Sequence, residues 1–352
     1  MKKTDLLSLF PNELEEYILS INEPKYRAKQ LFTQMHRGVY PADMTNISKA
    51  TKKKLEDTSF YYIPQIRKRL ISAIDGTVKY LFELSDGNCV ESVVMRYKHG
   101  NTICVSSQVG CRMGCAFCAS TIGGRVRDLN ASEILGQIIA AQLDIGERIS
   151  NIVMMGIGEP LDNYSNVIRF LKLVGNEDGM NIGYRHISLS TCGIVDKIDA
   201  LAEEDMPITL SISLHASDDE TRSSIMPINK KWNVSALLDA CKRYYSITGR
   251  RISFEYTLIA GKNDTADAAL KLSALLNQKL RPKSRGESFP IHVNLIPVNP
   301  VNETQFSASD KQAVSRFADV LEKNGIRATV RRRLGADINA SCGQLRREEE
   351  QK

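Results

Sequence analysis

Hydrophobic residues recur with two different periods along the chain. From Leu14 to Ile21 and again from Ala28 to Met35 they are three or four residues apart, which is typical of amphipathic helices. From about residue 72 the spacing changes. The segments 77–84 and 90–95 flank an Asp-Gly turn and predict two antiparallel strands. The pattern therefore predicts a helical N-terminal unit followed by a β-hairpin.

Strand-like and helix-like segments alternate over the rest of the chain. Such alternation predicts right-handed crossovers and a parallel sheet, open or curled into a partial barrel, so the expected fold class is α/β. The expected strands are 102–107, 151–156, 186–191, 208–214, 252–259, 291–298 and 327–332. The expected helices are 131–143, 164–175, 195–203, 235–247, 265–279 and 308–324. We expect four units: 1–70 helical, 71–100 a hairpin linker, 101–300 the α/β barrel, and 301–352 a C-terminal helix, strand and tail.

Composition excludes several classes of protein. The 352 residues are 42% hydrophobic and 25% charged, which is typical of a folded globular chain. No apolar run reaches the roughly 18 residues that a membrane span needs. The first residues do not resemble a secretory signal, so we expect a cytoplasmic protein without a membrane partner.

Positive charge is concentrated near the N-terminus. The net charge is only +6, but the stretch from Pro24 to Arg69 contains eleven Lys and Arg. Its acidic residues are only Asp43, Glu56 and Asp57. Such a region can neutralise RNA phosphates or form an ordinary solvated helix surface. Around Tyr26 cations alternate with aromatic residues, and aromatic rings can stack on unpaired bases.

Three of the eight cysteines, Cys111, Cys115 and Cys118, lie within eight residues after the first expected barrel strand. Clustered thiols in a reducing compartment bind metal or do chemistry more often than they form disulfides. A structural zinc site usually takes four ligands, and no second cysteine pair follows. Three thiolates suit an iron–sulfur cluster with one open iron. A zinc site and an unmetallated loop remain open as alternatives.

Other unusual residues follow the carboxyl ends of the later strands, the edge where parallel sheets bind ligands. Turn and cap roles are the ordinary interpretation of each residue alone. The residues at this edge are Gly158, Glu159, Ser190, Ser213, Leu214, His215 and Asn299.

Four ordered motifs resemble one family. They are Cys-Val-Ser-Ser-Gln-Val-Gly-Cys at 104–111, Gly-Ile-Gly-Glu-Pro at 156–160, Met-Pro-Ile-Asn-Lys-Lys at 226–231 and Asp-Ile-Asn-Ala-Ser-Cys-Gly-Gln-Leu at 337–345. Together they resemble the RlmN-type adenine carbon-2 methyltransferases, radical S-adenosylmethionine (SAM) enzymes that modify 23S ribosomal RNA and tRNA. The likeness extends from residue 23 to residue 345. It implies a radical-SAM partial (βα)6 barrel with an RNA-binding N-terminal accessory domain.

The resemblance also implies roles for individual residues. Cys111, Cys115 and Cys118 would hold a 4Fe–4S cluster, and two SAM molecules would be used per turnover. Cys342 would accept a methyl group, Glu91 would accept the carbon-2 proton, and Cys104 would form a transient disulfide with Cys342. The implied SAM-binding residues are Gly158, Glu159, Ser190, Ser213, Leu214, His215 and Asn299. An electron donor such as flavodoxin and a monomeric state are expected.

Two other functions remain open. Cfr-type enzymes use the same machinery on carbon 8 of the same ribosomal adenine, although Val109 and Pro160 resemble the carbon-2 group. A non-catalytic RNA-binding protein with a zinc-filled cysteine loop is the alternative from another class.

Overall fold

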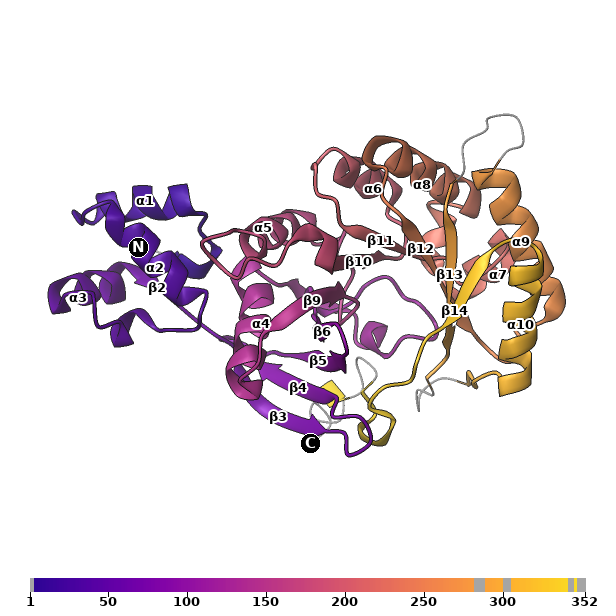
Figure 1. Cartoon of the computed structure of the whole chain (residues 1–352), viewed down its shortest axis with the longest axis horizontal. Coiled ribbons are helices and arrows are strands. Elements are labelled where there is room, and N and C mark those ends of the chain that lie inside the picture. The colour runs from indigo at the N-terminus through magenta and orange to yellow at the C-terminus, as the bar shows by residue number, and fades with distance from the viewer. Residues whose placement is uncertain (1–2, 282–288, 300–304, 341–344, 347–352) are drawn as a thin grey trace.

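The computed structural model describes residues 3–281, 289–299, 305–340 and 345–346. A helical unit at the N-terminal end adjoins a curved sheet with helices packed along it (Figure 1). The α/β fold class predicted from the sequence is confirmed. None of the helices in these ranges is long and apolar enough to cross a bilayer.

The N-terminal unit contains three helices, α1 (Pro11–Ser20), α2 (Tyr26–Met35) and α3 (Lys49–Thr58). Two short strands, β1 (Thr4–Asp5) and β2 (Ser59–Phe60), pair in parallel beside them. The expected helical periodicity is confirmed in α1 and α2, whose inward-facing residues include the fully buried Leu14, Ile18 and Leu31.

The helical prediction is wrong at the end of this region, because Gln65–Ile71 forms β3, an edge strand of the main sheet. Its sequence, Gln-Ile-Arg-Lys-Arg-Leu-Ile, is largely exposed. Charged residues are common on edge strands, where they discourage pairing with another chain. They also leave no buried face whose alternation would reveal a strand.

The main sheet has ten strands within the described residues, in the order β14-β13-β12-β11-β10-β9-β6-β5-β4-β3. Strands β6 and β9 to β14 run parallel, and β3, β4 and β5 continue the sheet as an antiparallel hairpin extension. The remaining bounds are β4 Val78–Glu83, β5 Cys89–Tyr97, β6 Gly100–Cys104, β9 Ile149–Met154, β10 Ile187–Thr191, β11 Thr209–Ser213, β12 Ile252–Leu258, β13 Ile291–Pro297 and β14 Arg327–Val330.

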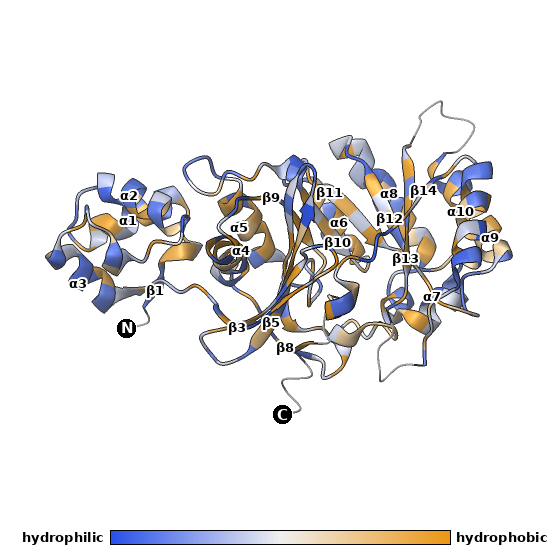
Figure 2. Ribbon diagram, turned by 60° about the horizontal axis from the view of Figure 1, so that its bottom comes forward, coloured by the Kyte–Doolittle hydropathy of each residue, from blue (hydrophilic) through white to orange (hydrophobic). Residues whose placement is uncertain are grey.

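Helices join the parallel strands and lie near the expected positions. Their bounds are α4 Ala131–Ile145, α5 Tyr164–Val174, α6 Val195–Ala202, α7 Asp219–Ile225, α8 Val234–Thr248, α9 Ala266–Leu280 and α10 Lys311–Lys323. The pattern did not predict α7, nor the small antiparallel pair β7 (Gln108–Gly110) and β8 (Arg125–Asp128). Helix α4, packed on the sheet, is largely hydrophobic, whereas α3 is largely hydrophilic (Figure 2).

The central strands alternate between two kinds of side chain. Phe254 and Val293 are fully buried in the hydrophobic core. On the opposite face, Ser213, Glu255 and Asn294 lie side by side in the register of β11, β12 and β13. Because alternate residues of a strand face opposite sides, the sheet has one apolar face and one face lined with small polar groups. This polar face forms the interior of the barrel.

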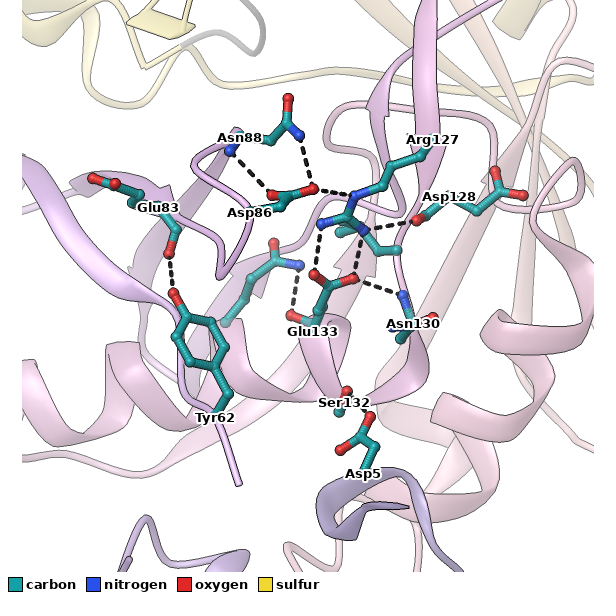
Figure 3. A network of polar contacts seen from close by, with 12 residues as sticks. Asp5, Tyr62, Glu83, Asp86, Asn88, Arg127, Asp128, Asn130, Ser132 and Glu133 are labelled. Carbon is teal, nitrogen blue, oxygen red and sulfur yellow. Dashed lines mark hydrogen bonds and ion pairs between the residues drawn. The ribbon is translucent and has the colours of Figure 1, made fainter. Parts of the chain in front are cut away.

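An arginine network ties the hairpin to the barrel (Figure 3). The guanidinium of Arg127 pairs with Asp86 in the hairpin turn at 2.6 Å and with Glu133 in the first turn of α4 at 2.8 Å. The hydrogen bond from Arg127 holds the pKa of Asp86 well below its usual range. Ser132 beside it donates a hydrogen bond to Asp5. The start of α4 is thus the junction of hairpin, barrel and N-terminal unit.

Candidate active site

The cysteine loop is closed at its base and supported from both sides. The backbone N–H of Cys111 donates to Gly124 O at 3.0 Å, next to the pairing of β7 with β8. The Nε of Arg112 donates to Asp162 at 3.0 Å, and the N–H of Ala116 donates to Ile225 O at 2.9 Å. These bonds hold the loop in shape against the ends of the neighbouring strands.

Cys111, Cys115 and Cys118 line one cavity of about 230 Å³. Burial raises the pKa of Cys111 to about 12 and that of Cys115 well above its ordinary value. A cation that compensates the thiolate charge removes this penalty. Within the described residues no three His, Cys, Asp or Glu converge on a single ion. A cubane cluster distributes its thiolates over separate iron atoms, so the donor set fits a 4Fe–4S cluster.

Five of the seven residues expected to bind SAM line the same cavity, which is called the SAM cavity below after this expectation. They are Gly158, Glu159, Ser190, Ser213 and His215. Asn299 lines an adjoining cavity. Leu214 lines neither, since it is fully buried in the hydrophobic core. The structure therefore brings six of the seven to two adjacent cavities although they follow different strands.

Gly158 and Glu159 shape the loop after β9. Gly158 has φ +106°, and a Cβ there would lie 2.6 Å from the Cβ and 2.8 Å from the backbone N of Gln108. The glycine thus allows close approach to Gln108 in the chain itself. The carboxylate of Glu159 accepts hydrogen bonds from the N–H of Cys192 at 2.7 Å and of Leu161 at 3.1 Å. Burial raises the pKa of Glu159, and these donors oppose the shift.

His215 is a hydrogen-bond donor to the cavity rather than a base. Its Nδ1 accepts from the N–H of Thr257 at 2.9 Å, so the ring proton is on Nε2. Burial lowers the pKa of His215 to about 3, which keeps the ring neutral. The ring packs edge-on against Phe117 of the cysteine loop, with centroids 5.0 Å apart.

Sequence reasoning missed Arg222, a fully buried arginine on α7. Its guanidinium donates to Cys192 O at 2.7 Å, Leu214 O at 3.0 Å and Asn229 Oδ1 at 3.0 Å. It thereby joins three loops that border the SAM cavity. Its place four residues before the 226–231 motif was the available signal, but no helix was predicted there.

Glu255 on β12 was also missed, and it lines the SAM cavity. Its carboxylate accepts from Asn294 Nδ2 at 2.7 Å and Ser253 Oγ at 3.1 Å, and burial raises its pKa. Alternation along Ile252–Leu258 was a usable signal, because it places a carboxylate on the polar face of an apolar strand.

A second cavity, of about 250 Å³, adjoins the first and shares Met155, Ile296 and Arg331 with it. Cys104 lies on its wall, opposite Val93 of β5. Its other lining residues include Met95, Tyr97, Arg332, Arg333 and Leu334. Cys104, the thiol predicted to form the transient disulfide and called the resolving thiol below, therefore lines a cavity that adjoins the SAM cavity. Three arginines line the same cavity as Cys104.

The two remaining expected catalytic residues are Glu91 and Cys342, and the structure describes only Glu91. Glu91 is fully buried, pairs with Lys79 Nζ at 3.1 Å and accepts from the backbone N–H of Arg346 at 2.7 Å. Alternation along the hairpin, taken alone, favours a solvent-facing side chain at position 91, and the burial of Glu91 shows that this interpretation is wrong. Cys342 lies outside the described residues.

Two family models match the chain. "Radical SAM superfamily" matches residues 105–272, and "Ribosomal RNA large subunit methyltransferase N-terminal domain" matches residues 4–60. These ranges contain the cysteine loop and the N-terminal helices respectively.

Curated relatives match nearly the whole chain. The probable dual-specificity RNA methyltransferase RlmN of Clostridium acetobutylicum is 53% identical over 95% of this chain and 94% of its own length. That of Clostridium novyi is 51% identical over 97% and 98%. The crystal structure of a radical SAM methyltransferase from Sphaerobacter thermophilus superposes with a TM-score of 0.90 at 40% identity, covering 97% of this chain and 98% of the other.

Proposed function

This chain belongs to the RlmN family of radical SAM RNA methyltransferases, and we propose that it methylates carbon 2 of adenosine in two RNAs. It is a SAM-dependent enzyme of the class that carries a 4Fe–4S cluster. The proposed substrates are an adenosine in the peptidyl-transferase centre of 23S rRNA and the adenosine next to the anticodon in tRNA. The dual-specificity name of the relatives supports two substrates.

The observation that carries the proposal is the pair of adjoining cavities. One is lined by the three thiols and the polar strand ends, and the other by Cys104 and three arginines. A radical generated in the first cavity would form next to the cavity that Cys104 lines. The second also combines apolar walls with cations, which suits a flipped base and its phosphate.

Cys111, Cys115 and Cys118 would hold the cluster, and Gly158, Glu159, Ser190, Ser213 and His215 would surround SAM, with Asn299 at the adjoining wall. When bound, the cluster and SAM supply a 5′-deoxyadenosyl radical. The chain's part is to hold these groups together and exclude water. The neutral His215 contributes a donor without adding charge.

Carbon 2 lies between two ring nitrogens and is too electron-poor to attack a methyl group, so two cysteines do the transfer. The thiolate of Cys342 takes a methyl from one SAM, releasing S-adenosylhomocysteine. A hydrogen atom then leaves this methyl and ends in 5′-deoxyadenosine, and the remaining carbon radical bonds to carbon 2. Glu91 would accept the carbon-2 proton, and the electron released by the adduct would return to the bound cluster, which balances the electron used to cleave SAM.

Release completes the cycle. The thiolate of Cys104 bonds to the sulfur of Cys342, the carbon–sulfur bond breaks, and the carbon takes a proton to become the methyl group on RNA. The disulfide takes two electrons and two protons from a flavodoxin-type donor. Disulfide formation requires the two Cα atoms to come within about 7 Å.

The N-terminal unit is proposed to dock RNA. Its exposed aromatics Tyr26 and Tyr40 lie among cations. A cavity in this unit is lined by Lys49, Lys52 and Phe60, among others. Rings that can stack on unpaired bases beside cations that bind phosphates are the expected features of an RNA surface. We place the enzyme in the cytoplasm, as a monomer.

Nucleoside analysis tests the proposed reaction. Ribosomal and transfer RNA from a strain lacking the gene, with and without complementation, are digested and measured by mass spectrometry. Complementation is expected to restore 2-methyladenosine in both RNAs. Recovery of 8-methyladenosine alone would replace the proposal by the Cfr-type reaction, and absence of any methyladenosine would contradict it.

A further inference from the structure

A buried ion pair in the hairpin contacts the C-terminal segment, a name used here for the described residues 335–340 and 345–346. The side chains of Lys79 and Glu91 are 1% and 0% exposed, and Lys79 Nζ lies 3.1 Å from Glu91 Oε2. Lys79 Nζ donates to Asn339 O at 2.9 Å, and Glu91 Oε1 accepts from Arg346 N at 2.7 Å. Two points of the chain that are seven residues apart are therefore held by one pair of charges.

The register places this pair close to Cys104. Lys79 of β4 is opposite Val93 of β5, and Val93 is in turn opposite Cys104 of β6. Glu91 is two residues from Val93 on β5, so all four side chains share one face of the sheet. The ion pair and the predicted resolving thiol thus lie on neighbouring strands of a single surface.

Two carboxylates at the rim anchor the segment further. Asp337 accepts from Ser72 Oγ at 2.7 Å and from Ala73 N at 2.8 Å. Asp75 accepts from Gly335 N at 2.9 Å. Leu345 is buried, with 3% of its surface exposed. The segment returns to β3 and β4 in Figure 1, where its yellow helical turn lies beside these strands.

Burying two charges in this position is expensive, and apolar residues of similar volume would stabilise a fold as well or better. A Lys and a Glu are useful here because both carry a second contact, one to a carbonyl and one to an N–H of the same segment. Apolar side chains could not bind those backbone groups. The pair therefore has a use that packing does not explain.

We propose that Lys79 and Glu91 form a clamp that fixes residues 339 and 346 on the hairpin, and that methylation of Cys342, which lies between them in the sequence, depends on this clamp. Lys79 is then a positioning residue. The inference rests on the proposed function for the role of Cys342, and it adds to Glu91 a task that precedes proton transfer. A clamp acts before RNA binds, whereas a proton acceptor is needed only after the RNA adduct forms.

The test compares Lys79→Met with Arg67→Met in the anaerobically purified holoenzyme. Arg67 forms an exposed ion pair with Glu83 across the same hairpin at 3.3 Å, so its loss is the matched control. Hydrogen exchange of the peptide containing Arg346 reports docking. Mass spectrometry of the Cys342 peptide after incubation with SAM, without RNA, reports the first methyl transfer.

Lys79→Met is expected to speed exchange at the segment and to slow methylation of Cys342, each by about tenfold or more, with unchanged iron content. Arg67→Met should change neither. Wild-type exchange and methylation in Lys79→Met would overturn the clamp. A wild-type enzyme that methylates RNA with no methyl on Cys342 would instead overturn the proposed function, while the exchange measurement would still test the clamp.

Two further variants complete the test. The first is used if Lys79→Met does not fold, and the second separates the clamp from proton transfer at Glu91. If Lys79→Met unfolds, Asp337→Asn removes a rim anchor without burying a lone charge, and faster exchange of the same segment is expected. An unchanged rate in both Asp337→Asn and Glu91→Gln would contradict the clamp. Glu91→Gln should slow methylation of Cys342 before RNA is added; normal methylation with a stalled RNA adduct would leave Glu91 as proton acceptor only.

Discussion

The active site has two walls, which are held by different kinds of contact. The first wall is the cysteine loop, and the second is the C-terminal segment together with the hairpin strands that it contacts. The cysteine loop is fixed by nearby groups, such as the bond from Cys111 N to Gly124 O. The C-terminal segment is fixed by contacts across 255 to 265 residues, from Glu91 to Arg346 and from Ser72 to Asp337. The first wall needs the chain only as far as α7, where Ile225 O accepts from Ala116 N. The second needs the hairpin and the whole barrel in place. One wall is suited to hold a cofactor rigidly, and the other to present the cysteine that is proposed to react twice.

Removing a cluster ligand should have the largest effect and act only on the first wall. Cys115→Ala is expected to abolish iron binding and to lower RNA methylation more than about 100-fold, since even supporting residues cost 10–100-fold at metal sites. Iron and sulfide analysis with a methylation assay measures this. Hydrogen exchange at the C-terminal segment should stay unchanged. Cys89→Ser, a half-buried thiol outside the loop, is the control; equal iron in both variants would contradict the assignment.

Arg222→Met tests whether the first wall depends on one buried side chain. It leaves the carbonyls of Cys192 and Leu214 without their donor in a dry site. We expect a loss of about 3–5 kcal/mol in the free energy of unfolding and weaker SAM binding. Urea unfolding and SAM titration measure the two effects. Arg243→Met breaks an exposed pair with Asp199 and should cost less than about 1 kcal/mol. Similar losses in both variants would show that Arg222 has no special role.

Acid should loosen the second wall selectively. Burial raises the pKa of Asp75, but hydrogen bonds from Gly335 and Thr77 outweigh it and leave the pKa at about 2. A lowered folded-state pKa stabilises docking above the unfolded value of about 4, and this contribution is lost as the pH falls toward 2. Pepsin cleavage near residue 335 should therefore accelerate over this range. Asp75→Asn should be cleaved readily and show less pH dependence; identical profiles would contradict this assignment.

The sequence predicted the first wall well because its signals are local. Three cysteines in eight residues and polar residues after each strand locate the cavity without knowledge of the fold. The strand and helix positions followed from apolar periodicity, which is strong where one face is buried. Leu214 shows the limit, since a position in a motif does not say whether the side chain faces the cavity or the core.

The second wall was harder to predict because its contacts join distant parts of the chain. Nothing near Glu91 indicates burial beside Lys79, and the hairpin pattern alone suggests a solvent-facing carboxylate. Arg222 was missed for a related reason: α7 is short and carries too few apolar residues to show a helical period. The burial of Lys79 and Glu91 by tertiary contacts left no local signature in the sequence.

The central claim is that Cys342 carries the carbon that is transferred and that Cys104 releases it. The Cys104→Ala holoenzyme is incubated with RNA and SAM labelled with carbon-13 in its methyl group, then digested with nuclease and protease. We predict a peptide joined through Cys342 and one labelled carbon to carbon 2 of an adenosine. Normal release of methylated RNA by this variant, or attachment of RNA at another residue, would contradict the account.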